Sequence, residues 1–339
     1  MSDMVVSVQN LEKRYGGMGR KVHALRGVTM DVPRGSIFGL LGPNGAGKST
    51  LVKILITAVK RSGGGGTVLG RPIGNKDALR KVGYLPEHHN LPKHLTGRQV
   101  IEFFGAMSNM PRAERKRRAD ELLDLVKMRD WHKKKVGGYS KGMRQRIGIA
   151  QALVSDPDLV ILDEPTDGVD PAGRRDIRVM LQRMRDDGRT VFINSHLLGE
   201  LELVCDTVAI MHKGNVVSMG TIEQLTRGMQ RYEVEVDRPD PMSLVETIVQ
   251  RAPRASEGDA PSRTRVLATG ETIEARENRL FVGTTDAQAI QPVLDAIRAK
   301  GGVIKEVRTH RPSLEDLFMQ AVEQDDSPGA ARGKDGGRP

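Results

Sequence analysis

Short apolar runs recur along the first 230 residues of the chain, separated by glycine loops and by segments of helical periodicity. The run Ser36 to Leu41 is uncharged and is followed by a glycine, which is typical of a buried strand, and helical periodicity follows from Ser49 to Lys60. The glycines Gly63 to Gly66 then predict a turn. Strand-like runs lie at residues 5–8, 28–32, 36–41, 81–85, 159–162, 190–194 and 208–211. The last three each follow a helical segment, and this order predicts an α/β fold with a largely parallel sheet.

A helical subdomain is expected within this domain, between about residues 90 and 155. Val100 to Met128 has helical spacing and is strongly charged, with a basic run from Arg112 to Arg118. A run of this kind is usually the solvated face of a helix, with RNA or lipid headgroups as alternative partners.

The pattern changes after about Gln230, where prolines become frequent and the apolar spacing loosens. We therefore predict two domains, at residues 1–230 and 231–324, followed by a disordered tail at residues 325–339 that is rich in Gly, Asp and Arg. In the second domain, strands are predicted at 232–236, near 266, at 280–282 and at 303–309, helices at 242–250, 287–300 and 314–322, and a polar loop at 255–264. The βαββαβ order suggests a small α+β domain of ferredoxin-like type.

Composition narrows the classes of function. The 339 residues can form two domains with sizeable cores, which excludes a peptide or a small disulfide scaffold. Lys and Arg total 53 against 43 Asp and Glu, and the charge of +10 suits a nucleotide, a nucleic acid or an anionic membrane face. Aromatic residues make up only 3%, which argues against base stacking as the main mode of binding. The single cysteine, Cys205, allows no intrachain disulfide and fits a cytosolic setting.

Segments for export or for membrane insertion are not expected. The N-terminus has no basic segment followed by an apolar one. The uncharged stretch Gly35 to Gly47 is short and rich in glycine, whereas a spanning helix needs about 20 mostly apolar residues. A role at a membrane would therefore require a partner.

The clearest chemical motif is Gly42-Pro43-Asn44-Gly45-Ala46-Gly47-Lys48-Ser49-Thr50, between the predicted buried strand and the following helix. It fits the phosphate-binding pattern G-x-x-x-x-G-K-S/T, which requires that context. Its glycines let backbone N–H groups surround a phosphate, and the helix N-terminus adds positive potential. Lys48 would reach the β- and γ-phosphates, and the Ser49 hydroxyl would ligate Mg²⁺. The alternative is an ordinary glycine turn before a helix.

A second motif follows the apolar run Leu159 to Leu162, where Asp163 and Glu164 stand side by side. Asp163 is placed to hold Mg²⁺ through water, and Glu164 to orient or deprotonate the water that attacks the γ-phosphorus. Two acids that cap the next helix are the alternative. With the phosphate-binding loop, the pair indicates phosphoryl-transfer chemistry.

Further segments complete a set of motifs in one order. They are Tyr139-Ser140-Lys141-Gly142-Met143-Arg144-Gln145-Arg146 at the start of a helical stretch, Asp167-Gly168-Val169-Asp170-Pro171 after the acid pair, and Ser195-His196 after a strand. Together with the two motifs above, they closely resemble an ABC-type ATPase over about Val5 to Gln230. The resemblance implies a P-loop NTPase core of ABC type that hydrolyses ATP with Mg²⁺.

The resemblance assigns roles to residues of one subunit's own site. Tyr15 would stack on adenine, and Gly42 to Thr50 would bind the phosphates. Glu87 would lie in the loop that senses Mg²⁺ and the membrane partner. His196 would hold the γ-phosphate and the attacking water in place.

Other residues would act across a dimer. By the resemblance, Ser140 and Gly142 would touch the γ-phosphate of the ATP held by the opposite subunit, and Asp170 would link the two sites. One chain carries one P-loop and one signature. The working unit is therefore expected to contain two ATPase subunits, as a homodimer.

Two positions depart from the family's pattern. The usual signature is Leu-Ser-Gly-Gly-Gln, and within Tyr139 to Met143 only Ser140 and Gly142 match it. Glu87 replaces the usual Gln, and an ionised carboxylate binds metal but donates no hydrogen bond. Both changes, and the segment Arg311 to Phe318, resemble bacterial exporter ATPases that pair with a separately encoded permease.

The resemblance thus implies a subunit that dimerises on ATP and drives export through an integral-membrane permease, in the cytoplasm and peripheral on the inner face of the cell membrane. A soluble ABC-type ATPase acting on ribosomes or nucleic acid is the alternative, but such factors usually carry two ATPase units in one chain. A small-molecule kinase would leave Asp170 and His196 without a shared role. His88, His89 and His94 lack the cysteines and fixed spacing of a metal site, so a solvated loop is expected there.

Overall fold

The computed structural model describes residues 4–16, 22–226, 230–237, 240–246, 248–250, 264–267, 270–310 and 313–319. The chain divides into two compact units, one formed mainly by the residues up to Leu225 and the other by Thr226–Leu317. The predicted tail at 325–339, nearly all of the predicted loop at 255–264 and the end of the helix predicted at 314–322 lie outside the described residues.

The first unit is built around a six-stranded sheet in the order β10-β9-β3-β8-β7-β6. The strands are β3 (Ile37–Leu41), β6 (Val82–Leu85), β7 (Leu159–Asp163), β8 (Thr190–Asn194), β9 (Thr207–His212) and β10 (Asn215–Gly220). All neighbours pair in parallel except β10, which joins β9 antiparallel. Every residue of β3, β7 and β8 is buried, as expected for a sheet covered on both faces. The predicted α/β fold is confirmed, and the carboxyl ends of these three strands meet at one edge.

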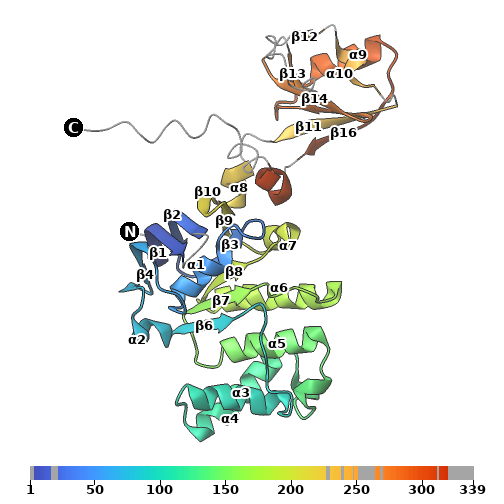
Figure 1. The fold of residues 1–339 in the computed structure, drawn as a ribbon. Helices are drawn as coiled ribbons and strands as arrows, with labels where there is room; N and C mark the ends of the chain where they lie inside the picture. The colour runs from blue at the N-terminus through green and yellow to red at the C-terminus, as the bar shows by residue number, and fades with distance from the viewer. Residues whose placement is uncertain are drawn as a thin grey trace, which may run out of the picture. The chain divides into compact units, whose positions relative to one another are not determined.

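Helices lie between most strands of this sheet along the chain. The helices of this unit are α1 (Lys48–Leu55), α2 (Lys76–Leu79), α3 (Gly97–Met107), α4 (Arg112–Leu125), α5 (Lys141–Ala152), α6 (Pro171–Asp186), α7 (Leu198–Glu202) and α8 (Ile222–Thr226), with short 3₁₀ turns at Arg129–Trp131 and Val136–Gly138. Figure 1 shows α6 alongside β7, with α5, α3 and α4 beyond it. Helix α5 packs on β6 and also contacts α3 and α4.

One helix prediction in this unit was wrong in its extent. The helix expected over 49–60 ends at Leu55, because Thr57 adopts a left-handed backbone with φ of 62°. The helical spacing over 100–128 belongs to two helices, since the chain turns at Asn109, with φ of 59°, and Pro111 begins a new helix.

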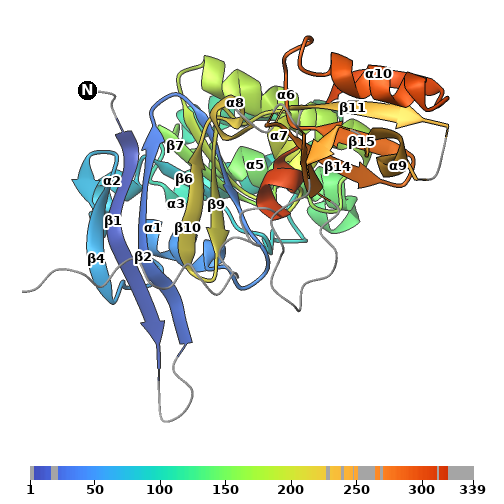
Figure 2. The same cartoon turned by 90° about the horizontal axis from the view of Figure 1, so that it is seen from above.

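A second, antiparallel sheet lies on the same unit in the order β2-β1-β4-β5. Its strands are β1 (Met4–Tyr15), β2 (Val22–Pro33), β4 (Gly63–Val68) and β5 (Arg71–Pro72), of which β1, β2 and β4 run side by side in Figure 2. The turn predicted at Gly63 to Gly66 is therefore wrong. A Cβ at Gly66 would lie 2.3 Å from the backbone oxygen of Ser7, so the glycines let β4 approach β1 more closely than other residues could.

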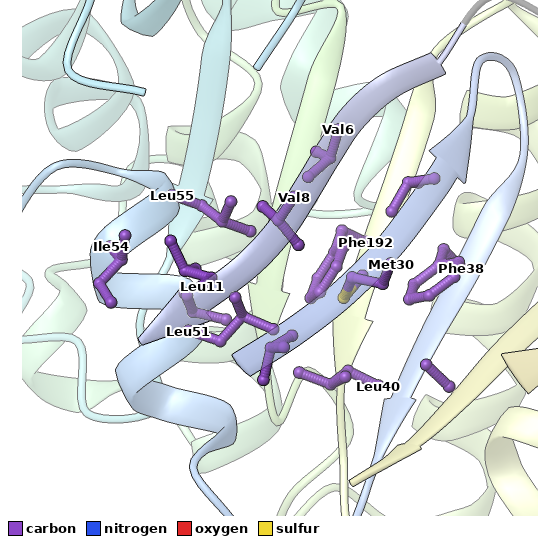
Figure 3. Packing of buried hydrophobic residues seen from close by; sticks show 14 of the residues in the cluster. Val6, Val8, Leu11, Met30, Phe38, Leu40, Leu51, Ile54, Leu55 and Phe192 are labelled. Carbon is purple, nitrogen blue, oxygen red and sulfur yellow. The ribbon is translucent and has the colours of Figure 1, made fainter. Parts of the chain in front are cut away.

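The main core lies between the antiparallel sheet, α1 and the parallel sheet. Val8 and Met30 from the first sheet, and Leu51 from α1, meet Phe38 and Phe192 of β3 and β8 (Figure 3). The two phenylalanine rings stack with centroids 5.3 Å apart. This packing holds the loop between β3 and α1 against rigid elements on both sides.

The second unit contains one antiparallel sheet in the order β12-β13-β14-β15-β11-β16. Its elements are β11 (Arg231–Val236), α9 (Met242–Val245), β12 (Val249–Gln250), β13 (Thr264–Leu267), β14 (Thr272–Arg276), β15 (Arg279–Val282), α10 (Gln291–Ala299) and β16 (Ile304–His310). The helix predicted at 242–250 was too long, because its last two residues pair with β13 as a strand, and β14 was missed. In Figure 1, α9 and α10 lie on one face of the sheet, and apolar residues of β11, β14 and β15 fill that face.

No helix among the described residues is long and apolar enough to cross a membrane.

Candidate functional site

The loop from Gly42 to Gly47 joins the buried strand β3 to helix α1. Gly47 caps α1 with φ of 105°, and a Cβ there would lie 2.6 Å from the backbone oxygen of Ala24. Both the backbone conformation and the close approach therefore require glycine. The eight-residue helix that follows contributes no acidic residue in its first turn, so its N-terminal positive potential is not offset.

Lys48 is the first residue of α1 and is only 7% exposed. Its Nζ donates to the carbonyl oxygen of Gly42 at 2.6 Å. Burial lowers the pKa of Lys48, and the nearby carboxylates of Glu164, Asp163 and Glu87 oppose that effect. A buried ammonium group thus lies close to three carboxylates at the end of the loop.

Asp163 is the last residue of β7 and is paired in register with Asn194, the last residue of β8. The Asn194 side-chain amide donates to Asp163 Oδ1. Burial raises the pKa of Asp163, a shift that this hydrogen bond opposes. The parallel pairing of two buried strands therefore sets the position of this carboxyl group.

Glu164 follows β7 with a left-handed backbone, φ 53°, and is 8% exposed. Its backbone N–H donates to the carbonyl oxygen of Asn194 at 2.8 Å. Its side chain meets two residues after β8: the Ser195 hydroxyl donates to Oε2 at 3.0 Å, and His196 Nδ1 lies 2.8 Å from Oε1. The segment that follows β8 therefore holds both carboxylate oxygens of Glu164.

These groups surround one cavity of about 230 Å³ at the carboxyl ends of β3, β7 and β8. It is lined by Asn44, Lys48, Ser49, Glu87, Asp163, Glu164, Asn194 and His196. A larger cavity, of about 630 Å³, lies beside the end of α1 and β4, and its lining includes none of the predicted site residues. The volume of a cavity therefore does not identify the candidate site here. The charged side chains that converge on the smaller cavity do.

Several predicted residues lie outside the lining of the 230 Å³ cavity. Tyr15 ends β1, and the Lys13 ammonium group lies 4.7 Å from the centre of its ring. Ser140 caps α5, Gly142 lies in the first turn of that helix, and Asp170 caps α6. The remaining predicted residues belong to the glycine loop or to α1: Gly42, Pro43, Gly45, Ala46, Gly47 and Thr50.

Sequence reasoning assigned no role to Asn194 or to Ser195. Each holds one of the two acids: Asn194 is the last residue of the apolar strand β8, and Ser195 follows it. The available signal was this pair of polar residues where an apolar run ends. It could not be interpreted before β8 was known to lie next to β7.

The lining of the cavity fits an ATP phosphate with Mg²⁺. The described residues contain no group of three or more His, Cys, Asp and Glu side chains arranged to hold a metal ion. Mg²⁺, however, usually takes one or two carboxylates together with phosphate and water oxygens. Ser49, Glu87 and Asp163 supply oxygens to one cavity, and Asn194 Oδ1 is buried there without a hydrogen-bond partner in the described part of the chain.

Comparison with known proteins identifies the family. The model of the family described as ABC transporter matches residues 25–167. An uncharacterized ABC transporter ATP-binding protein of Nostoc sp. is 36% identical over 95% of this chain and 91% of its own length. The daunorubicin resistance ATP-binding protein DrrA3 of Streptomyces coeruleorubidus is 32% identical over 96% of this chain and 98% of its own.

Solved structures agree with this identification. An ATP-binding subunit of an ABC transporter is 29% identical over 66% of this chain and 93% of its own length, with a TM-score of 0.59. An ATP-binding cassette in a dimeric, post-hydrolysis state with ADP and Pi is 25% identical over 64% of this chain and 98% of its own, also with a TM-score of 0.59. This chain therefore belongs to the family of ABC transporter ATP-binding proteins, and it is an ATPase.

Proposed function

We propose that this chain is the ATP-hydrolysing subunit of a membrane exporter, that it dimerises on ATP, and that it acts through a separate integral-membrane permease. The observation that carries the proposal is the 230 Å³ cavity. It joins the glycine loop, the two acids after β7 and His196 at one edge of the parallel sheet. Ligands of open α/β sheets bind outside the carboxyl ends of the strands.

In this proposal, the residues of one subunit bind the triphosphate. Lys48 and the backbone N–H groups at the start of α1 bind the phosphates. Ser49, Glu87 and Asp163 would supply the protein oxygens that hold Mg²⁺, and the ion would supply positive charge to the phosphates. Tyr15 stacks on the adenine.

Hydrolysis then depends on Glu164 and His196. Glu164 lines the cavity, and its Oε1 lies 2.8 Å from His196 Nδ1. In this position Glu164 would orient or deprotonate the attacking water. His196 is half exposed, so it can contact both the γ-phosphate and that water. The buried position of Glu164 excludes competing water from its other oxygen.

A second copy of the chain completes the site. Ser140 and Gly142 are outside the lining of the cavity in their own subunit. The Ser140 hydroxyl accepts a hydrogen bond from the Met143 N–H, so its own proton remains available to donate. We propose that Ser140 and Gly142 contact the γ-phosphate held by the partner subunit, and that Asp170 links the two sites. The dimeric cassette with ADP and Pi supports this arrangement.

The similarity to the daunorubicin resistance protein supports an export role. By that analogy, the chain binds a permease at the inner face of the cell membrane. Closure of the dimer on ATP would change the access state of the permease, and hydrolysis would reset it, because the closed state is favoured only while γ-phosphate contacts exist.

The test is to express tagged Glu164→Gln protein in its own cells, extract it with mild detergent in Mg-ATP, and identify the proteins that co-purify. The ATP-locked form is expected to retain a polytopic membrane protein at near-equal stoichiometry. Wild-type protein extracted in Mg-ADP is the control and is expected to retain less. Ribosomes or nucleic acid in place of a membrane protein would overturn the proposal in favour of a soluble ABC-type ATPase.

A further inference from the structure

Ser195 lies between the last residue of β8 and His196, and it is 1% exposed. Its backbone N–H donates to the carbonyl oxygen of Leu40 in β3 at 3.3 Å. Its backbone is therefore held by β3 as well as by β8, which it follows directly. Ser195 is absent from the lining of the 230 Å³ cavity, whereas Glu164 and His196 are both part of that lining.

The direction of the Ser195 hydroxyl proton follows from its two hydrogen-bond partners. The Leu197 N–H donates to Ser195 Oγ at 3.1 Å, and a backbone N–H can only donate. The other partner is Glu164 Oε2 at 3.0 Å, and an ionised carboxylate can only accept. The single hydroxyl proton must therefore point at Oε2. The Leu197 N–H, at the start of α7, thus orients the Ser195 hydroxyl as a donor to Glu164 before any substrate binds.

We propose that Ser195 is a positioning residue for hydrolysis, which holds Glu164 Oε2 on the protein side so that Oε1 faces the cavity. Without this bond, the half-exposed His196 would be the one remaining side-chain partner of the Glu164 carboxylate among the described residues, and the carboxylate could rotate away from the attacking water. The left-handed backbone at Glu164 is strained for a residue other than glycine, so contacts with the surrounding structure must hold this residue in place. This inference rests on the proposed role of Glu164.

The first experiment compares Ser195→Ala with Ser195→Thr, which keeps the hydroxyl. Loss of a hydrogen bond to a charged group is expected to lower kcat about tenfold, while the Kd for ATP stays within about twofold, because Ser195 touches no phosphate. Ser195→Thr is expected to recover kcat to within about threefold of wild type. The matched control is Ser36→Ala, which also removes a buried hydroxyl group. The Ser36 hydroxyl donates to the carbonyl oxygen of Pro33 at 2.7 Å, and Ser36 directly precedes the first residue of β3, at the strand end opposite the cavity. Ser36→Ala is expected to leave kcat unchanged.

The second experiment covers the case in which the extra methyl group of threonine does not fit. Ser195→Ala is combined with Glu164→Gln, and the single-turnover rate of hydrolysis is measured in all four proteins. If Ser195 acts through Glu164, the alanine change costs less than about twofold in the Glu164→Gln background. An equal loss in both backgrounds, or a wild-type kcat for Ser195→Ala alone, would overturn the inference.

The two proposals fail in different ways. Full activity of Glu164→Gln would remove the proposed role of Glu164 and the inference with it. A strong loss in Glu164→Gln together with full activity in Ser195→Ala would overturn the inference alone.

Discussion

Each unit of the molecule buries a glutamate, and the two glutamates have different partners. Glu164, 8% exposed, follows the end of a parallel strand, and its side chain meets a serine hydroxyl and a histidine. Glu233, 3% exposed, lies within the antiparallel strand β11. The guanidinium groups of Arg279 and Arg308 donate to its Oε1 at 2.7 and 2.9 Å.

The difference separates the environment of the proposed catalytic glutamate from that of a structural one. Glu233 is neutralised by two cations from the neighbouring strands β15 and β16, so its oxygens join three strands. Glu164 has no arginine or lysine among its hydrogen-bond partners in the described residues, and it lines a cavity together with His196, its half-exposed partner. A buried carboxylate is available for chemistry when it borders a cavity and no guanidinium group occupies its oxygens.

The largest expected effect tests the catalytic side of this comparison. In Glu164→Gln, steady-state ATPase activity is expected to fall at least ~100-fold, because an amide cannot accept the proton of the attacking water. ATP binding is expected to persist, since the phosphate-binding loop is untouched. Phosphate release and equilibrium ATP binding are the measurements. Wild-type phosphate release would remove Glu164 from its proposed role.

The same substitution at Glu233 tests the structural side. Glu233→Gln leaves two arginines without their shared carboxylate, which is expected to cost about 1–3 kcal/mol of local stability. Amide exchange in β11, β15 and β16, followed by mass spectrometry, is expected to accelerate by roughly tenfold or more. The ATPase rate per folded molecule is expected to be unchanged. Glu235→Gln, at a less buried position on the same strand, is the matched control and is expected to show a smaller change.

Asp176 tests whether a carboxylate is structural because of its hydrogen-bond partners or because of the unit in which it lies. Asp176 of α6 lies in the catalytic unit, but it accepts from Lys127 and Arg146, each at 2.7 Å. These hydrogen bonds lower the pKa of Asp176. The side chain is therefore expected to behave like Glu233, as a structural group.

The pH dependence of Asp176→Asn follows from that direction. Because the pKa of Asp176 is lower in the folded state, the ionised carboxylate stabilises the fold at pH values above its unfolded pKa of ~3.9. This stabilisation is lost as the pH falls through the folded-state pKa. The substitution is expected to cost about 0.5–1 kcal/mol at pH 7, and less as the pH falls below the unfolded value. Urea unfolding followed by Trp131 fluorescence measures the cost at each pH. A cost that is independent of pH would show that packing, not charge, explains the loss.

The smallest effect is expected at the Lys141–Asp167 ion pair. Nζ and Oδ2 lie 2.7 Å apart, but both side chains are about half exposed. Lys141→Met is therefore expected to lower the free energy of unfolding by less than about 1 kcal/mol, and less still in high salt. Asp167→Asn is the matching variant. A loss of several kcal/mol would mean that this pair is shielded from solvent.

The parts of the site that lie in contiguous residues could be predicted from the amino-acid sequence. The run Gly42 to Thr50, directly after an apolar run, predicts a loop and the start of a helix in contiguous residues. Asp163 and Glu164 follow an apolar run that predicts β7. The alternation of helical and apolar segments likewise predicted the α/β fold. Such signals depend on neighbours within a few residues, and a single sequence records those directly.

The tertiary structure alone decided the pairings between distant segments. Asn194 and Ser195 became partners of the two acids only through the parallel register of β7 and β8. The glycines at 63–66 became a strand only through the close approach of β1, and Glu233 met its arginines only across β15 and β16. Register and strand order depend on how whole layers pack, because a one-residue slip would turn every side chain to the other face. Local periodicity does not contain that information.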